Sequence, residues 1–275
     1  MIDLMSIKSR PSKDVLLLGL AIALLGGLSG CSIAPSVPAT KADLITDSDE
    51  TGARKLARIR LELATGYFEQ GKTTTALDEL KQSIIADPNL FEAHNLRGLI
   101  YMRLNDVGLA EASFKQALKI NPRAASVQHN YGWLMCQQSR FREAVQWFSA
   151  AIADPAYGDR AKTWMAQGLC QMKAGLVADA EASLAHSYEL DAGNPITGYN
   201  LALVLFQRSE FVRSQFYVRR INNSELANAE TLWLGIKVER RVDNRDAVAQ
   251  LASQLKKRFP QSRELASYEK GAFNE

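Results

Sequence analysis

Apolar residues recur at helical spacing through most of the chain, and no stretch alternates apolar and polar residues as a β-strand would. The clearest stretch runs from Phe91 to Pro122 and divides into two amphipathic segments around the polar pair Asn105-Asp106. Asn and Asp favour turns because their side chains bond to nearby backbone groups. Pro122 ends the second segment, since proline lacks an amide hydrogen and clashes with the preceding helical turn. The stretch therefore predicts a helix–turn–helix unit.

Small and aromatic residues in this unit have the spacing of the tetratricopeptide repeat (TPR), whose pattern is G-x2-Y…A-x3-F…P. The matching residues are Gly98, Tyr101, Ala110, Phe114, Ala117 and Pro122. The small side chains let two antiparallel helices approach closely, and the aromatic rings fill the space beside them. One unit cannot bury its own apolar face, so further copies are expected on both sides.

Six such units are expected within a TPR domain over residues 53–275. They lie near residues 57–90, 91–124, 125–160, 161–194, 195–227 and 228–261, followed by a capping helix over 262–270. Pro88 and Pro122 are 34 residues apart, which is the TPR period, and the segment from Asp154 to Asp159 lengthens the link between the third and fourth units. The expected fold is all-α, a right-handed superhelical α-solenoid of about six TPR repeats with a concave inner face.

The N-terminus differs from the repeats. A basic start precedes an apolar run over residues 15–28, which is too short for a comfortable membrane span and has the form of a secretory signal. The sequence Leu28-Ser29-Gly30-Cys31 then resembles the lipobox of bacterial lipoproteins. In that family the signal, here residues 1–30, is cleaved and the cysteine carries lipid. The resemblance implies acyl chains such as palmitate on Cys31; the alternative is a plain signal peptide with an incidental cysteine.

Residues 31–52 contain prolines, serines, threonines and acids without apolar periodicity, so we expect a lipidated flexible tether. Ser32, rather than an aspartate, follows the cysteine. By the sorting rule of lipoproteins, this implies a protein held in the outer membrane by its lipid and facing the periplasm. The lipid anchor would be its contact with the membrane.

Composition and motifs argue against an enzyme. The chain has 275 residues, of which 47% are hydrophobic and 23% charged, and a net charge of +3 without a long basic run, so no nucleic-acid partner is expected. His94, His129 and His186 fall in different units without metal-ligand spacing, and His94 takes a packing position. No phosphate loop or nucleophile motif is present. We therefore expect no catalytic residue, no metal, no cofactor beyond the lipid on Cys31, and no small-molecule substrate.

Cys136 and Cys170 lie in the first helices of neighbouring units. The periplasm is oxidising, so a disulfide is one interpretation. The other, which we favour from the sequence, is that both behave as small hydrophobic residues inside helices.

The informative surface is the inner face, which the first helix of each unit lines in TPR proteins. The family's ligand-contacting positions, transferred one at a time, predict a partner-binding groove. Its residues are Arg58, Leu61, Phe68, Leu99, Met102, Arg103, Trp133, Met165, Leu169, Met172, Tyr199, Leu203 and Phe206. The same transfer gives His129 and Cys136 in the third unit, and Leu232, Ile236 and Glu239 in the sixth. Methionines and aromatics suit peptide binding. For the middle units, a tightly wound superhelix with a partly buried inner face is an equal alternative.

A lipobox followed by six TPR units resembles the PilF/PilW family, the type IV pilus pilotins. The stretch from Asn130 to Tyr157 matches the family pattern N-x-G-x-x-L-C…Y/F-x-x-A-x-x-x-F-x-x-A. The resemblance implies an outer-membrane lipoprotein that binds the pilus secretin and promotes its localisation and multimerisation, as twitching motility requires. The alternative is a TPR lipoprotein scaffold of another envelope machine, in β-barrel assembly or peptidoglycan-synthase regulation.

Overall fold

The computed structural model describes residues 49–273, so the expected signal peptide and Cys31 lie outside the described residues. Within that range the secondary structure is helical, and strands are absent from it. The helices are α1 (Gly52–Glu69), α2 (Thr73–Ala86), α3 (Phe91–Arg103), α4 (Val107–Ile120), α5 (Ala125–Gln137), α6 (Phe141–Ile152), α7 (Arg160–Lys173), α8 (Val177–Leu190), α9 (Pro195–Gln207), α10 (Phe211–Asn222), α11 (Ala229–Arg241), α12 (Arg245–Arg258) and α13 (Arg263–Glu269).

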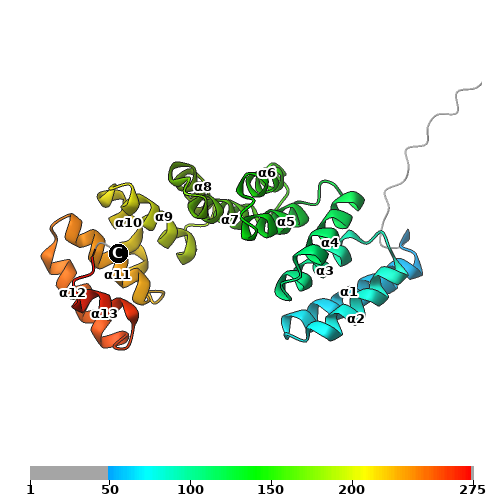
Figure 1. Ribbon diagram of the computed structural model, residues 1–275, viewed down its shortest axis with the longest axis horizontal. Helices are drawn as coiled ribbons and strands as arrows, with labels where there is room; N and C mark the ends of the chain where they lie inside the picture. The colour runs from blue at the N-terminus through cyan, green and yellow to red at the C-terminus, as the bar shows by residue number, and fades with distance from the viewer. Residues whose placement is uncertain (1–48, 274–275) are drawn as a thin grey trace, which may run out of the picture. The chain divides into compact units, whose positions relative to one another are not determined.

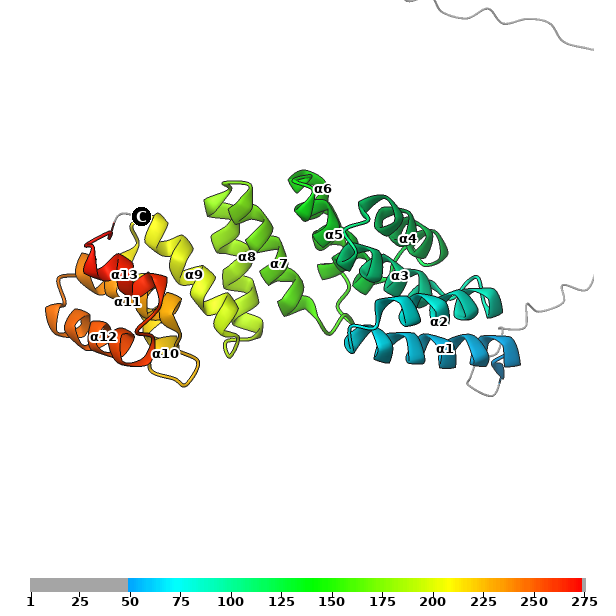
Figure 2. The same ribbon diagram turned by 60° about the horizontal axis from the view of Figure 1, so that its bottom comes forward.

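The helices form six consecutive hairpins followed by α13 (Figure 1). Each hairpin packs against the next one in chain order, so that α2 contacts α3, α4 contacts α5, and so on to α10 and α11 (Figure 2). The first helices of neighbouring hairpins also contact each other, from α1 with α3 to α9 with α11. This stacking is an α-solenoid, and it confirms the expected fold class.

Each hairpin turns through one residue in the left-handed backbone conformation. These residues are Gly71, Asn105, Ser139, Gly175, Ser209 and Asp243, with φ between 55° and 76°. They recur every 34 residues, except that the longer link before α7 adds two residues between Ser139 and Gly175. The Asn105-Asp106 turn was expected from the sequence, and Asp106 also caps α4 by accepting a hydrogen bond of 3.0 Å from the Leu109 amide. The recurrent turn gives every repeat the same reversal of direction.

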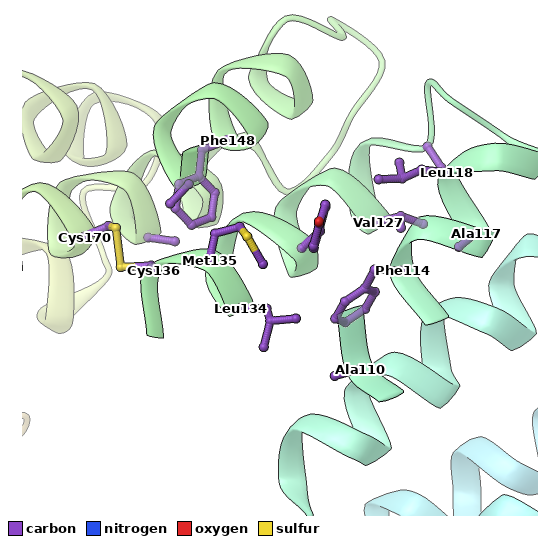
Figure 3. Close-up of a cluster of buried hydrophobic side chains, with 14 residues drawn as sticks. Ala110, Phe114, Ala117, Leu118, Val127, Leu134, Met135, Cys136, Phe148 and Cys170 are labelled. Atoms are coloured by element: carbon purple, nitrogen blue, oxygen red, sulfur yellow. A yellow bond between two sulfur atoms is a disulfide. The ribbon is translucent and has the colours of Figure 1, made fainter. Parts of the chain in front are cut away.

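Close approach within a hairpin depends on a glycine facing a large side chain. Phe114 of α4 is fully buried and lies against Gly98 of α3, where an added Cβ would be 2.5 Å from the ring. Gly132 and Phe148 repeat the arrangement in the next hairpin. Both phenylalanines belong to one apolar cluster that joins the second, third and fourth repeats (Figure 3). The sequence pattern of small and aromatic residues thus sets the distance between paired helices.

At the C-terminal end, α13 packs on α11 and α12. Its Leu265 is buried in a cluster that also contains Leu232 and Ile236 of α11. A short final helix therefore covers the apolar side of the last repeat, as terminal caps of solenoids do.

Candidate partner-binding groove

The predicted groove residues lie on α1, α3, α5, α7 and α9, the first helices of the first five repeats. Every apolar member of the set is partly exposed, and both arginines, Arg58 and Arg103, are exposed. These side chains pack on the core with one side and present the other to solvent. Such a surface combines fixed geometry with accessible apolar area, which is what a peptide-binding groove needs.

The first part of the groove lies between α1 and α3. Leu61, Phe68 and Leu99 pack against the cluster that fills the first repeat. The guanidinium of Arg103 covers the Phe68 ring, 3.7 Å from the ring centroid. Arg58 lies further along α1 and pairs with Glu50, its Nη1 being 3.2 Å from that carboxylate. A basic group and an aromatic ring are thus held side by side among partly exposed aliphatic side chains.

Leu99 connects this part with the next. It packs against the cluster of the first repeat and also against the cluster that spans the second to fourth repeats. Met102 and Trp133 pack against the second of these clusters. The surface from Leu61 to Trp133 is therefore supported by two adjoining cores.

The middle of the groove is fixed by a disulfide between Cys136 of α5 and Cys170 of α7 (Figure 3). The two Cα atoms are 5.8 Å apart, and both residues are buried. Our preference for two unpaired hydrophobic cysteines was wrong. They are 34 residues apart, two fewer than the 36 that separate the turns of these two repeats, so they hold different positions on the neighbouring first helices. The stacking distance of the two helices there matches the span of a disulfide.

One helical turn from each cysteine, Lys173 and Trp133 meet across the same pair of helices. The Lys173 Nζ atom lies 5.4 Å from the centroid of a Trp133 ring. On α7, Met165 and Met172 pack against the cluster of the fourth and fifth repeats, and Leu169 between them is partly exposed. The disulfide therefore ties together the two helices that present Trp133 and the methionines.

The last part of the groove lies on α9, where Tyr199, Leu203 and Phe206 pack against a cluster shared with α10 and α11. Lys237 of α11 lies 5.7 Å from the Phe206 ring centroid, and Arg241 lies 5.6 Å from it. This repeats the pairing of a cation with an aromatic ring seen at Phe68 and Trp133.

Tyr199 also borders a cavity of about 240 Å³ between α9, α11 and α13. Its lining includes Trp233, Lys237, Arg263 and Glu264. Burial raises the pKa of Tyr199 and lowers the pKa of Lys237, so this end of the groove is partly desolvated. Sequence reasoning missed Trp233 and Lys237 because neither stands at a transferred ligand-contacting position.

The transfer of family positions was wrong for several other residues. Leu232 and Ile236 are fully buried with Leu265 of α13, and Glu239 is buried in a salt bridge with Arg219 whose Nε–Oε1 distance is 2.6 Å. His129 is buried as well, and Cys136 is in the disulfide. A consensus position gives the direction of a side chain, whereas its exposure depends on which helix packs over it.

The two buried histidines have structural surroundings. His94 is 4% exposed and its Nε2 donates a hydrogen bond of 3.0 Å to the Pro88 carbonyl oxygen, which confirms the expected packing role. The Nδ1 atom of His129 shares a hydrogen bond of 2.8 Å with the Thr163 hydroxyl group. Burial lowers the pKa of His129 to about 4, and burial also lowers the pKa of His94. Both imidazoles are therefore neutral supports of the core at neutral pH.

The stacked hairpins and the partly exposed inner residues define a tetratricopeptide-repeat protein with a protein-binding type of surface. The tetratricopeptide repeat family model matches residues 61–125, 97–161 and 136–195. In the part of the chain that the structure describes, no helix combines the length and apolar character needed to cross a bilayer.

Among known proteins, the chain is 26% identical over 250 residues to the type IV pilus assembly protein PilF of Pseudomonas aeruginosa, covering 91% of this chain and 96% of PilF. A solved structure of Pseudomonas aeruginosa PilF superposes with a TM-score of 0.73 at 26% identity, covering 80% of this chain and all of that one. The crystal structure of PilW, a widely conserved type IV pilus biogenesis factor, gives a TM-score of 0.70 at 29% identity, with coverages of 78% and 98%. In sequence and in fold, the chain is thus similar to the TPR proteins PilF and PilW along most of its length.

Proposed function

We propose that this protein is a type IV pilus biogenesis factor of the pilotin kind. In this proposal it is anchored in the outer membrane by lipid on Cys31, faces the periplasm, binds the pilus secretin and promotes its localisation and multimerisation. Support comes from the relationship to PilF and PilW along nearly the whole chain and from the lipobox sequence at Cys31. The function is one of binding, and no catalytic step is assigned to the protein.

The observation that carries the binding part is the pairing of Phe68 and Arg103 among Leu61, Leu99 and Met102. An aromatic ring under a guanidinium offers apolar area next to a positive charge, and the hydrogen bond from Arg103 Nη1 to the Phe68 carbonyl oxygen holds the guanidinium in place. Arginine and large aromatic residues contribute strongly to protein interfaces for this reason. We infer that an extended or helical segment of the secretin binds along this surface, with apolar side chains toward the α1–α3 groove.

The lipid and the groove would act together. A lipid on Cys31 holds the protein at the membrane where the secretin ring forms, and the solenoid holds a secretin segment. Because bound subunits are kept on one surface, their effective concentration rises and assembly is favoured without any new contact between subunits.

The test is membrane fractionation of a deletion strain, with the secretin detected on an unboiled gel. The proposal predicts loss of the heat-stable multimer while monomer persists, and recovery when the wild-type chain is supplied. A chain with Cys31→Ser should fold, bind secretin in solution and leave the secretin outside the outer membrane. A chain with Arg103→Ala should be correctly anchored but recover little multimer.

A normal secretin multimer in the outer membrane of the deletion strain would contradict the proposal. Co-purification would then test the alternative function. A scaffold of β-barrel assembly or peptidoglycan synthesis would co-purify with subunits of those machines instead of with secretin.

A further inference from the structure

The first helix carries an apolar stripe on the side away from its own hairpin. Leu56, Ile59 and Leu63 are 48%, 47% and 44% exposed. Their spacing of three and four residues puts them on one face of α1. Isolated exposed apolar residues are ordinary, but three on one helix face form a patch that marks an interaction site.

The same positions are covered in other repeats. Ile59 and Leu63 lie twelve and eight residues before Gly71, the left-handed turn residue of their hairpin. In the third repeat, Val127 and Tyr131 lie at the same distances before the turn residue Ser139. In the fifth repeat, Thr197 and Leu201 lie at the same distances before Ser209. All four are at most 3% exposed.

The preceding hairpin provides this cover. The Tyr131 ring contacts Phe114 of α4, with the ring centroids 6.1 Å apart. The hydroxyl groups of Thr197 and of Ser187 on α8 are 3.1 Å apart. For α1, the described residues contain no preceding hairpin, so the stripe is the open edge of the stack.

Two features of the chain indicate what covers this edge. The lipobox cysteine, Cys31, precedes Gly52, the first residue of α1, by 21 positions. Twenty-one residues of chain reach at most about 70 Å when fully extended. A lipid on Cys31 would therefore hold α1 near the bilayer surface.

The second feature is charge. Lys55 and Arg60 lie on the two sides of the apolar stripe at the 100° spacing of helical residues, whereas Arg54 and Arg58 lie on the groove side of α1. Lys55 is exposed, and Arg60 pairs with Glu79 of α2 at 2.7 Å while its side chain remains 39% exposed. A helix that joins an apolar stripe to basic residues suits an anionic lipid surface.

We propose that α1 lies on the periplasmic surface of the membrane, with Leu56, Ile59 and Leu63 inserted among the lipid headgroups and the flanking basic residues against anionic phospholipid. This inference rests on the lipid anchor of the proposed function. The contact fixes one end of the solenoid at the bilayer and turns the groove of α1 and α3 in a defined direction. A bilayer accepts such a stripe without a complementary protein groove.

The test uses the full lipoprotein reconstituted in vesicles of phosphatidylethanolamine and phosphatidylglycerol. Ile59→Cys is labelled with an environment-sensitive fluorophore; Cys136 and Cys170 do not react because they are paired. The matched control is Val212→Cys on α10, an apolar position that is 72% exposed. Mass spectrometry of the N-terminal peptide reports lipidation separately, so failure of the anchor and failure of α1 docking are distinguishable.

The expected result is a blue-shifted emission at position 59 and its loss when the lipids carry a quencher, with neither effect at position 212. Adding Leu56→Glu and Leu63→Glu to the labelled chain should abolish both effects while the thermal unfolding curve stays unchanged. In vesicles without phosphatidylglycerol, the blue shift and the quenching at position 59 should both be weaker.

Three outcomes would overturn the inference. The first is a water-like emission at position 59 in a chain that is lipidated. The second is equal quenching at position 212. The third is shielding of position 59 that requires added secretin or a second copy of the chain, since this would make the stripe a protein interface.

Discussion

Arg103 holds Phe68 from the neighbouring repeat by two interactions at once. Its guanidinium lies 3.7 Å from the ring centroid, and its Nη1 atom donates a hydrogen bond of 2.7 Å to the Phe68 carbonyl oxygen. The carbonyl belongs to the last turn of α1, where it also accepts a hydrogen bond of 3.0 Å from the Gly71 amide. The pair therefore caps α1 and fixes the ring that borders the first part of the groove.

Arg103→Ala should weaken binding of the secretin's periplasmic segment about tenfold, because it removes the two contacts that hold the Phe68 ring in the groove. An exposed cation–π contact is worth about 0.5–1 kcal/mol, and a hydrogen bond to a charged group about 1.5–3 kcal/mol. Titration calorimetry measures the change. Arg123→Ala, at an exposed turn position before α5, is the control and should bind as the wild type does. Equal affinity of the Arg103→Ala chain and the wild type would remove this site from the binding surface.

Removing the disulfide should lower stability without unfolding the solenoid. For the chain with Cys136→Ala and Cys170→Ala, we expect the free energy of unfolding to fall by about 2–4 kcal/mol, as is typical for a cross-link closing a loop of this size. Urea unfolding followed by circular dichroism measures it. Reductant should destabilise the wild type by a similar amount and leave the variant unchanged. A reductant effect of the same size on both chains would show that the cross-link is not the cause.

Gly98→Ala should destabilise the second repeat, since the new Cβ would be 2.5 Å from the fully buried Phe114 ring. Overpacking of this kind typically costs about 1–3 kcal/mol. The control is Gly66→Ala in α1, where nothing lies within 4 Å of an added Cβ. That change should stabilise the helix by up to about 1 kcal/mol, because alanine has the higher helix propensity. Thermal unfolding should therefore shift in opposite directions for the two variants.

Mild acid should destabilise the protein through His129. Burial lowers its folded pKa to about 4, while its unfolded value is near 6.5, so between these values the unfolded chain binds more protons. The contribution of neutral His129 is complete above pH 6.5 and is lost as the pH falls toward 4. The loss is at most on the order of 3 kcal/mol.

The measurement is the free energy of unfolding at a series of pH values from 7.5 to about 4. His129→Gln should make the dependence shallower. His186→Gln is the control, because the His186 side chain is 54% exposed and faces Glu189 on the same helix. If both variants keep the wild-type slope, another buried group such as His94, whose pKa is also lowered, carries the acid sensitivity.

The sequence by itself determined the repeat. The spacing of small and aromatic residues, as at Gly98 and Phe114, fixed the hairpin geometry, because a close helix approach needs a small side chain opposite a large one. The Asn105-Asp106 turn and the 34-residue period fixed the number and order of hairpins. These patterns are local, and each can be recognised from the sequence of a single repeat.

Contacts between repeats were decided only by the tertiary structure. Cys136 and Cys170 are paired because the stacking distance of α5 and α7 brings them together, and each residue taken alone also fits a hydrophobic core. Leu232 and Ile236 hold inner-face positions in the pattern but are covered by α13, whereas Ile59 and Leu63 hold core positions and are exposed. Exposure depends on the neighbouring repeat, and a pattern within one repeat carries no information about which neighbour is present.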